Sequence, residues 1–386
     1  MKIIIGILTF ITCAFLFLLA NTGDNDEHVM NSRLDYNTAR ILAVINDDTF
    51  VPEVGDPHFY GSPDGLRLGT ITYEILVTNG MFLGLVLEAD YHMNSPAHVE
   101  FSVGDYVSVR IFEYDNVIRT VEVRHPERMS ILWLLIASLL LFLCVIGGKR
   151  GILAVAGLVF AVLCVMFLLI PLLIIGFSPL IITLVILLLI TVVTIVMLAG
   201  TTSKSLIAIS GSVTGVILAL TVATIASNLV HVSGYNLTNA SAIMNLSDSQ
   251  VGGLFVSSVL IASIGALMDA CMSVASALVE IQYTSPEIKQ AQLFRSGFNI
   301  SRDIIGTMSS TLILAFLGSG LTVFVFMQIT NVSMNQFLNN DFVVMEVIKG
   351  VAGSFGIILA APLTALIGSY LLTSKRGLNN EKINDN

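Results

Sequence analysis

The chain has 386 residues, of which 55% are hydrophobic and only 12% are Asp, Glu, Lys or Arg. Because a soluble domain carries about a quarter charged residues, this composition excludes an ordinary soluble protein and indicates a polytopic α-helical membrane protein. The net charge of −9 comes from residues 21–129, which hold 18 acidic side chains against 7 Arg and no Lys, so this segment would repel nucleic acid.

Apolar runs that suit transmembrane helices recur along the chain. A membrane-spanning helix needs about 20 predominantly apolar residues. We predict eight spans, at residues 3–20, 131–146, 152–175, 180–198, 206–229, 254–281, 304–327 and 347–372. The first run is either a cleaved signal peptide or an uncleaved signal anchor, and its length favours a signal anchor over residues 1–20.

The basic residues predict an orientation. Lys and Arg accumulate in cytoplasmic loops. When the loops are counted alternately from Lys2, one side receives Lys149, Arg150, Lys204, Lys289, Arg295, Arg302, Lys375, Arg376 and Lys382, and the opposite short links contain no Lys or Arg. Lys349 lies near an outer end, where Glu346 can pair with it on a helix. We therefore expect both termini in the cytoplasm and residues 21–129 outside.

The exported segment, residues 21–129, has the pattern of a small β-rich domain. Strands are predicted at 41–45, 71–77, 82–87, 106–112 and 117–123, and apolar and polar residues alternate along 106–112. Asn79-Gly80 between the second and third strands is typical of a tight hairpin turn. About five short strands fit an OB-like or an SH3-like barrel, and the acidic surface is interpreted as a solvated face.

Neither histidine nor cysteine predicts a metal or cofactor site. Five of the six histidines lie in the acidic domain (His28, His58, His92, His98 and His125), where they could form a cation-binding vestibule, but their spacing is not that of metal ligands. The four cysteines lie in apolar runs and are interpreted as small buried side chains. We predict no metal and no cofactor.

Polar chemistry concentrates on the sixth and seventh predicted spans. Asp269 lies near the middle of a run rich in Gly, Ala and Ser, and on a helix it shares a face with Gly265, Ser273, Ser276 and Glu280. Asp303 begins the next span and shares a face with Thr307. An intramembrane carboxylate is costly if charged, so it should face a partner, a cavity or a proton.

Each of these residues also has a structural interpretation. Asp269 could be a helix-to-helix hydrogen-bonding group, and Glu280 and Asp303 could pair with Arg302 or mark helix ends near the interface. Gly211, Gly215 and Gly265 are interpreted as helix-packing positions, and Pro171 and Pro362 as kinks. Because Asp303 is expected near the cytoplasmic end, at a different depth from Asp269, and because HExxH and GxSxG motifs are absent, we predict that the chain is not an enzyme.

The segment from Gly265 to Phe316 resembles the YibE/F-like family of bacterial membrane proteins. The resemblance is carried by Gly265-Ala266-Leu267-Met268-Asp269, by Gly297-Phe298-Asn299-Ile300-Ser301-Arg302-Asp303-Ile304-Ile305-Gly306-Thr307-Met308, and by Gly147-Gly148-Lys149-Arg150-Gly151. The exported domain is similar to that of the longer, YibE-like members. The resemblance implies a protein of the bacterial cytoplasmic membrane and no particular substrate. The apolar runs predict its membrane domain at residues 130–386, with seven helices and a short cytoplasmic C-terminal tail.

Two functions from different classes follow. The first is a secondary transporter or export component that moves an unknown small solute or ion, with Asp269 coupling transport to a proton or cation. The second is a scaffold or sensor whose outer β-domain binds an envelope component or a partner protein. A YibF-like membrane protein or a second copy of the chain is the expected partner within the lipid bilayer.

Overall fold

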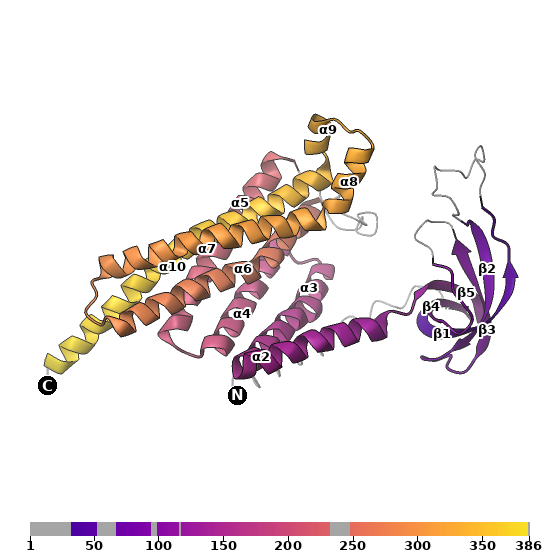
Figure 1. The fold of residues 1–386 in the computed structure, drawn as a ribbon, viewed down its shortest axis with the longest axis horizontal. Coiled ribbons are helices and arrows are strands. Elements are labelled where there is room, and N and C mark those ends of the chain that lie inside the picture. Colours follow the sequence, from indigo (N-terminus) through magenta and orange to yellow (C-terminus); the bar gives the residue numbers. More distant parts are fainter. Residues whose placement is uncertain (1–31, 52–66, 94–98, 116, 232–247, 385–386) are drawn as a thin grey trace. The chain divides into compact units, whose positions relative to one another are not determined.

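The computed structural model describes residues 32–51, 67–93, 99–115, 117–231 and 248–384. The chain divides into two compact units, residues 20–142 and residues 143–386. The first unit contains a β-barrel and the second contains a helical bundle (Figure 1). The predicted signal anchor, residues 1–20, lies outside the described residues.

Five strands close into a barrel. They are β1 (Ser32–Asp47), β2 (Gly69–Val77), β3 (Val86–Met93), β4 (Tyr106–Tyr114) and β5 (Val117–Pro126). Their order around the barrel is β1-β2-β3-β5-β4, and β1 closes it by pairing antiparallel with β4. A parallel β3–β5 contact accompanies the antiparallel ladders. Of the two predicted alternatives, this Greek-key order matches the OB-like barrel.

Alternation of side chains builds the barrel core. Val107, Val109 and Ile111 of β4 are fully buried, as the sequence pattern predicts, whereas the residues between them are only partly covered. β1 is much longer than the predicted strand at 41–45. Two register shifts along its ladder with β2 let it bend, so that one strand pairs with β4 and then with β2.

The predicted third strand at 82–87 is wrong, because β3 begins at Val86. Asn79 does not form a two-residue turn. Its Oδ1 instead accepts a hydrogen bond from the Thr38 backbone N–H of β1 at 2.6 Å. The turn therefore continues past Gly80 (φ +79°), and Phe82 packs into the barrel core from the loop. A loop whose apolar side chains cover a core resembles a short strand in composition, so the sequence pattern does not distinguish the two.

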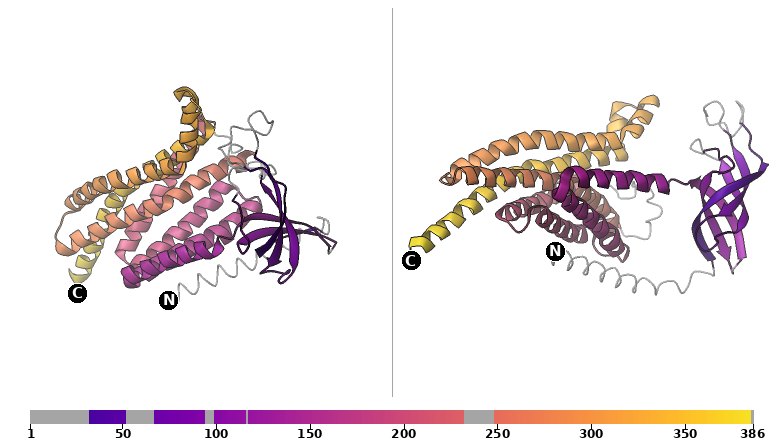
Figure 2. Two further views of the ribbon diagram at one scale, coloured as in Figure 1. Left: turned by 45° about the vertical axis from the view of Figure 1, so that its right-hand side comes forward. Right: turned by 60° about the horizontal axis from the view of Figure 1, so that its bottom comes forward.

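The second unit is built from helices, most of them long. In chain order they are α2 (Met129–Cys164), which begins in the first unit, a π-helical turn η2 (Val165–Leu169), α3 (Ile170–Ile174), α4 (Pro179–Ala199), α5 (Ser203–Leu229), α6 (Asp248–Thr284), α7 (Gln290–Ser319), α8 (Leu321–Ile329), α9 (Met334–Leu338) and α10 (Asp341–Asn384). α6 contacts α4, α5, α7 and α10, and α10 runs beside α5 and α7 (Figures 1 and 2). The π-helical turn directly precedes Pro171, which lacks a backbone N–H and disturbs the helix there.

The chain turns sharply within α2, at Gly148. The backbone of Gly148 is non-helical (φ +54°, ψ −136°). A Cβ atom placed on Gly151 would lie 3.4 Å from the Cys144 Cα. In a straight helix, residues seven positions apart are separated by about 10.5 Å along the axis, so the chain must fold back between Cys144 and Gly151. The turn separates the apolar runs that the sequence predicts as two spans, 131–146 and 152–175.

Among the described residues, six helical segments are long and apolar enough to cross a membrane, and one of them, Met129–Ile174, contains both of those predicted spans. The main difference from prediction concerns α7. It begins at Gln290 rather than at 304, and it ends at Ser319, where Gly320 separates it from α8. The early turns of α7 are polar, so hydropathy misses them, but Leu293 and Phe294 pack with Leu278 of α6 and Ala365 of α10.

Candidate functional site

α6 lies at the centre of the bundle and has one open face. Its window of highest hydropathy is half buried, the largest share among the six candidate spans. Ala270, Cys271, Val274 and Leu278 are completely buried against neighbouring helices. The exposed side chains on the opposite face include those of Asp269, Ser273 and Glu280, together with Gly265, and Ser276 beside them is half-buried. The predicted stripe on α6 is therefore its uncovered face.

α7 is the least covered of the candidate spans, with only 11% of its window buried. Leu293, Gly297, Ser301 and Leu312 form its packed face. The uncovered residues include several that are polar or small: Asn299, Arg302, Asp303, Gly306, Thr307, Ser310 and Thr311.

Two contacts determine how α6 and α7 are aligned. A Cβ atom on Gly297 of α7 would lie 2.7 Å from Leu278 of α6. A Cβ atom on Gly353 of α10 would touch both Leu312 of α7, at 2.6 Å, and Ser263 of α6, at 3.0 Å. Leu278 and Ser263 are 15 residues apart, and so are Gly297 and Leu312. The two helices therefore run antiparallel with a constant register over about 22 Å.

This register places the two carboxylates close in depth. The register aligns Asp269 of α6 with Gly306 of α7, which is three residues after Asp303. The two carboxylates are therefore offset by about 4.5 Å along the helix axes. Both lie near the middle of their candidate spans. The register thus brings Asp303 closer in depth to Asp269 than the sequence predicts, whereas the expected position of Asp303 near the cytoplasmic side of the membrane stays a prediction.

Within the described residues, no ion pair or hydrogen bond engages either carboxylate group. The hydroxyls beside them bond to their own helices. Thr307 Oγ1 donates to the Ile304 carbonyl at 3.1 Å, and Ser276 Oγ donates to the Met272 carbonyl at 2.6 Å. These bonds satisfy the hydroxyl donors locally, so within the described residues Asp269 and Asp303 keep unpaired carboxylates on the exposed faces of their helices, as does Glu280.

Comparison with known proteins identifies the family of the helical unit. A model of the YibE/F-like protein family matches residues 135–374, which is more than half of the chain. The chain belongs to the YibE/F-like family. No curated protein and no solved structure matches it.

The YibE/F-like match includes Asp269, Asp303 and both contacts that define their register, whereas the barrel lies outside it. The open face thus belongs to the family's shared region. Together with the apolar helices, this membership makes the chain a multi-pass membrane protein.

The three glycines predicted for packing have different environments in this YibE/F-like bundle. A Cβ atom on Gly211 would collide with Thr364 of α10, and one on Gly215 would lie 2.6 Å from the Ala360 Cβ and 2.8 Å from the Leu267 Cδ1. These two glycines let α5 approach α10 closely. Gly265 is different: no described atom lies within 4 Å of the position of a Cβ atom there. The interpretation of Gly265 as a packing position therefore does not hold for the described part of the chain.

Another carboxylate of the bundle, that of Glu346 in α10, lies beside the C-terminal end of α7. Glu346 is 7% exposed and pairs with Lys349 at 2.6 Å, as their spacing predicts. Its other oxygen accepts a hydrogen bond from Ser319 Oγ at 3.1 Å. The sequence carried no signal for Ser319, which comes from another helix. Because Glu346 is paired with a cation, it differs from Asp269 and Asp303, and a role in packing α10 against α7 explains it.

The barrel has charged groups in surface ion pairs. Arg67 lies between Asp47, at 2.6 Å, and Glu100, at 3.0 Å. Hydrogen bonds from Thr49 and from Arg67 lower the pKa of the Asp47 carboxyl below its usual range. His92 shares a hydrogen bond with Thr70 at 3.0 Å, and His28, His58 and His98 lie outside the described residues. Surface pairs of this kind contribute little to stability and suggest no chemistry.

Proposed function

We propose that this YibE/F-like protein is a secondary transporter or export component in which Asp269 and Asp303 bind and release a coupling proton or cation. The observation that carries the proposal is the register of α6 and α7, which brings two unpaired carboxylates, each on the exposed face of its helix, to nearly one depth. A charged carboxylate at mid-membrane costs about 3 kcal/mol even by permissive scales, so two of them without a structural partner call for a function.

Proton or cation exchange is the chemistry that such a pair performs. Two carboxylates at nearly one depth can take up and release a proton or a cation in turn, and each charge influences the protonation of the other. Neighbouring Ser273 and Thr307 supply oxygen atoms that can coordinate a passing cation or water. The open position of Gly265, one turn from Asp269, leaves room for this path.

The test compares Asp269→Asn, Asp303→Asn and the double variant with wild type. The full chain is reconstituted into liposomes that contain a pH-sensitive dye, and proton movement is recorded while one cation or solute after another is added. We expect each single variant to lose coupled proton movement, and the double variant to lose no more, because the two groups act as a unit. Ser310→Ala, on the same face, is the matched control and should keep the activity.

Full proton coupling in Asp269→Asn and Asp303→Asn would overturn the proposal. It would favour the alternative function, a scaffold or sensor in which deletion of residues 21–129 abolishes function and the carboxylates affect only stability.

We also infer that the chain crosses the bacterial cytoplasmic membrane eight times, with both termini in the cytoplasm and the barrel outside. The sharp turn at Gly148 supports two crossings within Met129–Ile174, since that segment would be about 69 Å long as one helix, against about 30 Å of hydrocarbon. The clustered Lys and Arg of alternate loops support the orientation.

We propose, finally, that a second copy of the chain covers the open face of α6 and α7. Asn299, Thr307 and Ser310 are exposed on α7. In a two-fold dimer within a membrane, equivalent residues lie at equal depth, so the polar side chains of one α7 can lie against those of the other. This arrangement keeps the polar face away from lipid.

A further inference from the structure

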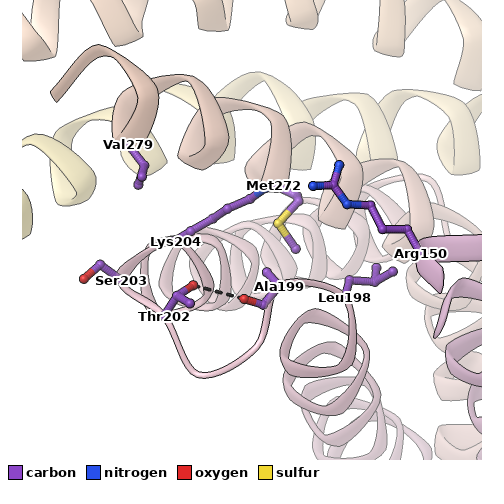
Figure 3. Close-up of a pocket in the computed structure, with 8 residues that line it drawn as sticks. All are labelled: Arg150, Leu198, Ala199, Thr202, Ser203, Lys204, Met272 and Val279. Atoms are coloured by element: carbon purple, nitrogen blue, oxygen red, sulfur yellow. Dashed lines mark hydrogen bonds between the residues drawn. The ribbon is translucent and has the colours of Figure 1, made fainter. Parts of the chain in front are cut away.

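Two cavities lie in line on the side of the bundle formed by α2, α4 and α6. The first, of about 690 Å³, has two cations in its lining, Arg150 and Lys204, together with residues such as Thr202 and Met272 (Figure 3). The second, of about 520 Å³, extends along α2, α4 and α6 between apolar side chains such as Ala161, Ile190 and Ile261. Leu198 lines both cavities, so they adjoin each other at this residue.

The first cavity has the chemistry of an anion site. In Figure 3, the side chains of Arg150 and Lys204 extend toward Met272 from opposite sides. Neither cation makes an ion pair within the described part of the chain. Glu280 follows the lining residue Val279 but lies about 100° further round α6. Thr202 caps the N-terminus of the 27-residue helix α5, whose dipole adds positive potential beside the two cations.

The second cavity has the dimensions of an acyl-chain groove. Along α4 its lining runs from Leu198 to Leu187, which is about 16 Å of helix. This length is about half of the hydrocarbon thickness, the depth of one leaflet. The position of Gly265 contributes open space to the groove wall.

We propose that the two cavities together bind one phospholipid with an anionic headgroup. The phosphate lies between Arg150, Lys204 and the first turn of α5, and an acyl chain lies in the groove between α2, α4 and α6. Basic residues at membrane-helix ends bind acidic headgroups in this manner, and a groove of one-leaflet depth distinguishes a lipid from a free anion.

The test uses the full chain purified in detergent. Bound lipids are extracted and identified by mass spectrometry, and stripped protein is titrated with phosphatidylglycerol, phosphatidylcholine or inorganic phosphate while its thermal unfolding is followed. We expect phosphatidylglycerol to copurify and to raise the melting temperature more than the other two. In Arg150→Gln/Lys204→Gln, phosphatidylglycerol should bind about 25-fold more weakly, since each basic side chain contributes about fivefold.

Two further variants make the result specific. Lys289→Gln/Arg295→Gln removes two cations that lie outside both cavities and should bind phosphatidylglycerol like wild type. Gly265→Leu should weaken phosphatidylglycerol binding by filling the groove, at a position where a Cβ atom meets no described neighbour within 4 Å.

Three outcomes would overturn the proposal. They are equal binding of phosphatidylcholine, unchanged phosphatidylglycerol binding in Arg150→Gln/Lys204→Gln, and stabilisation by inorganic phosphate that matches phosphatidylglycerol while Gly265→Leu has no effect. The last outcome would assign the first cavity to a free anion.

Discussion

At the scale of single residues, Gly215 and Gly265 show how one residue type serves two purposes in neighbouring helices. The Cβ position of Gly215 is 2.6 Å from the Ala360 Cβ, whereas that of Gly265 meets no described atom within 4 Å. The first glycine permits α5 and α10 to touch. The second leaves space beside Asp269 and in the apolar groove.

This difference predicts opposite effects of the same substitution. Gly215→Ala should lower the free energy of unfolding by about 1–3 kcal/mol, because the added methyl group overlaps Ala360 in a packed interface. Gly265→Ala should leave stability unchanged or raise it slightly, since Ala favours the helix. Thermal unfolding of the two variants in detergent measures both effects. Equal losses of stability in the two variants would contradict the packing described for α5 and α10.

At the scale of secondary-structure elements, the alignment of α6 with α7 is the feature on which the proposed function depends. It predicts that Cys residues replacing Asp269 and Thr307 are joined efficiently by a bismaleimide linker of about 10 Å, the usual separation of packed helices. Asp269→Cys with Leu314→Cys is the matched control, because Leu314 is also exposed but lies two turns further along α7, about 10.5 Å away.

The measurement is the intact mass of monomeric protein, in a background without the native cysteines. One linker attached at both ends is expected for the first pair, and two linkers attached at one end each for the second. Preferential joining of the second pair would show that the register is shifted and would remove the juxtaposition of Asp269 with Asp303.

The elements also show what local sequence can and cannot predict. The apolar runs that match α4 and α5 and the alternation along β4 were predicted because hydropathy and period are local properties. The hairpin of β2 and β3 was predicted with a tight turn, and its longer loop was missed because the Asn79 side chain bonds to Thr38, 41 residues away. The first turns of α7 were missed because Leu293 and Phe294 are covered only by packing on other helices.

The same contrast between local sequence properties and contacts of distant residues applies to the candidate site. A single sequence identifies Asp269 as an intramembrane carboxylate and places Ser273 and Glu280 on its face. It cannot supply the depth of Asp303 relative to Asp269, which depends on how Gly297 meets Leu278 and how Gly353 meets Leu312 and Ser263. The anion cavity was also missed, because Arg150 and Lys204 come from helices that are distant in sequence.

At the scale of the whole molecule, the open face of α6 and α7 predicts that the protein is a dimer. Ser310 is exposed on this face, and the α6–α7 register aligns it with Gly265. Gly215 of α5 lies beside Leu267 of α6. Because α5 and α6 run antiparallel, Ile217, two residues after Gly215, lies at the depth of Gly265. Ile217 is 46% exposed, but it belongs to α5, which packs on α4, α6 and α10. Ser310 and Ile217 are therefore a test position and a control position at one depth.

Copper-catalysed oxidation in native membranes should link two chains of a Ser310→Cys variant through a disulfide, and it should leave an Ile217→Cys variant monomeric. Both variants are made in a background without the native cysteines, and non-reducing gel electrophoresis measures the linked fraction. A dimer is expected only from Ser310→Cys, because a disulfide requires the two Cα atoms to approach within about 7 Å. Monomers from both variants, or equal linkage of both, would contradict a two-fold interface at α7. Linkage of Ser310→Cys to a different protein would assign the open face to a heteromeric partner instead.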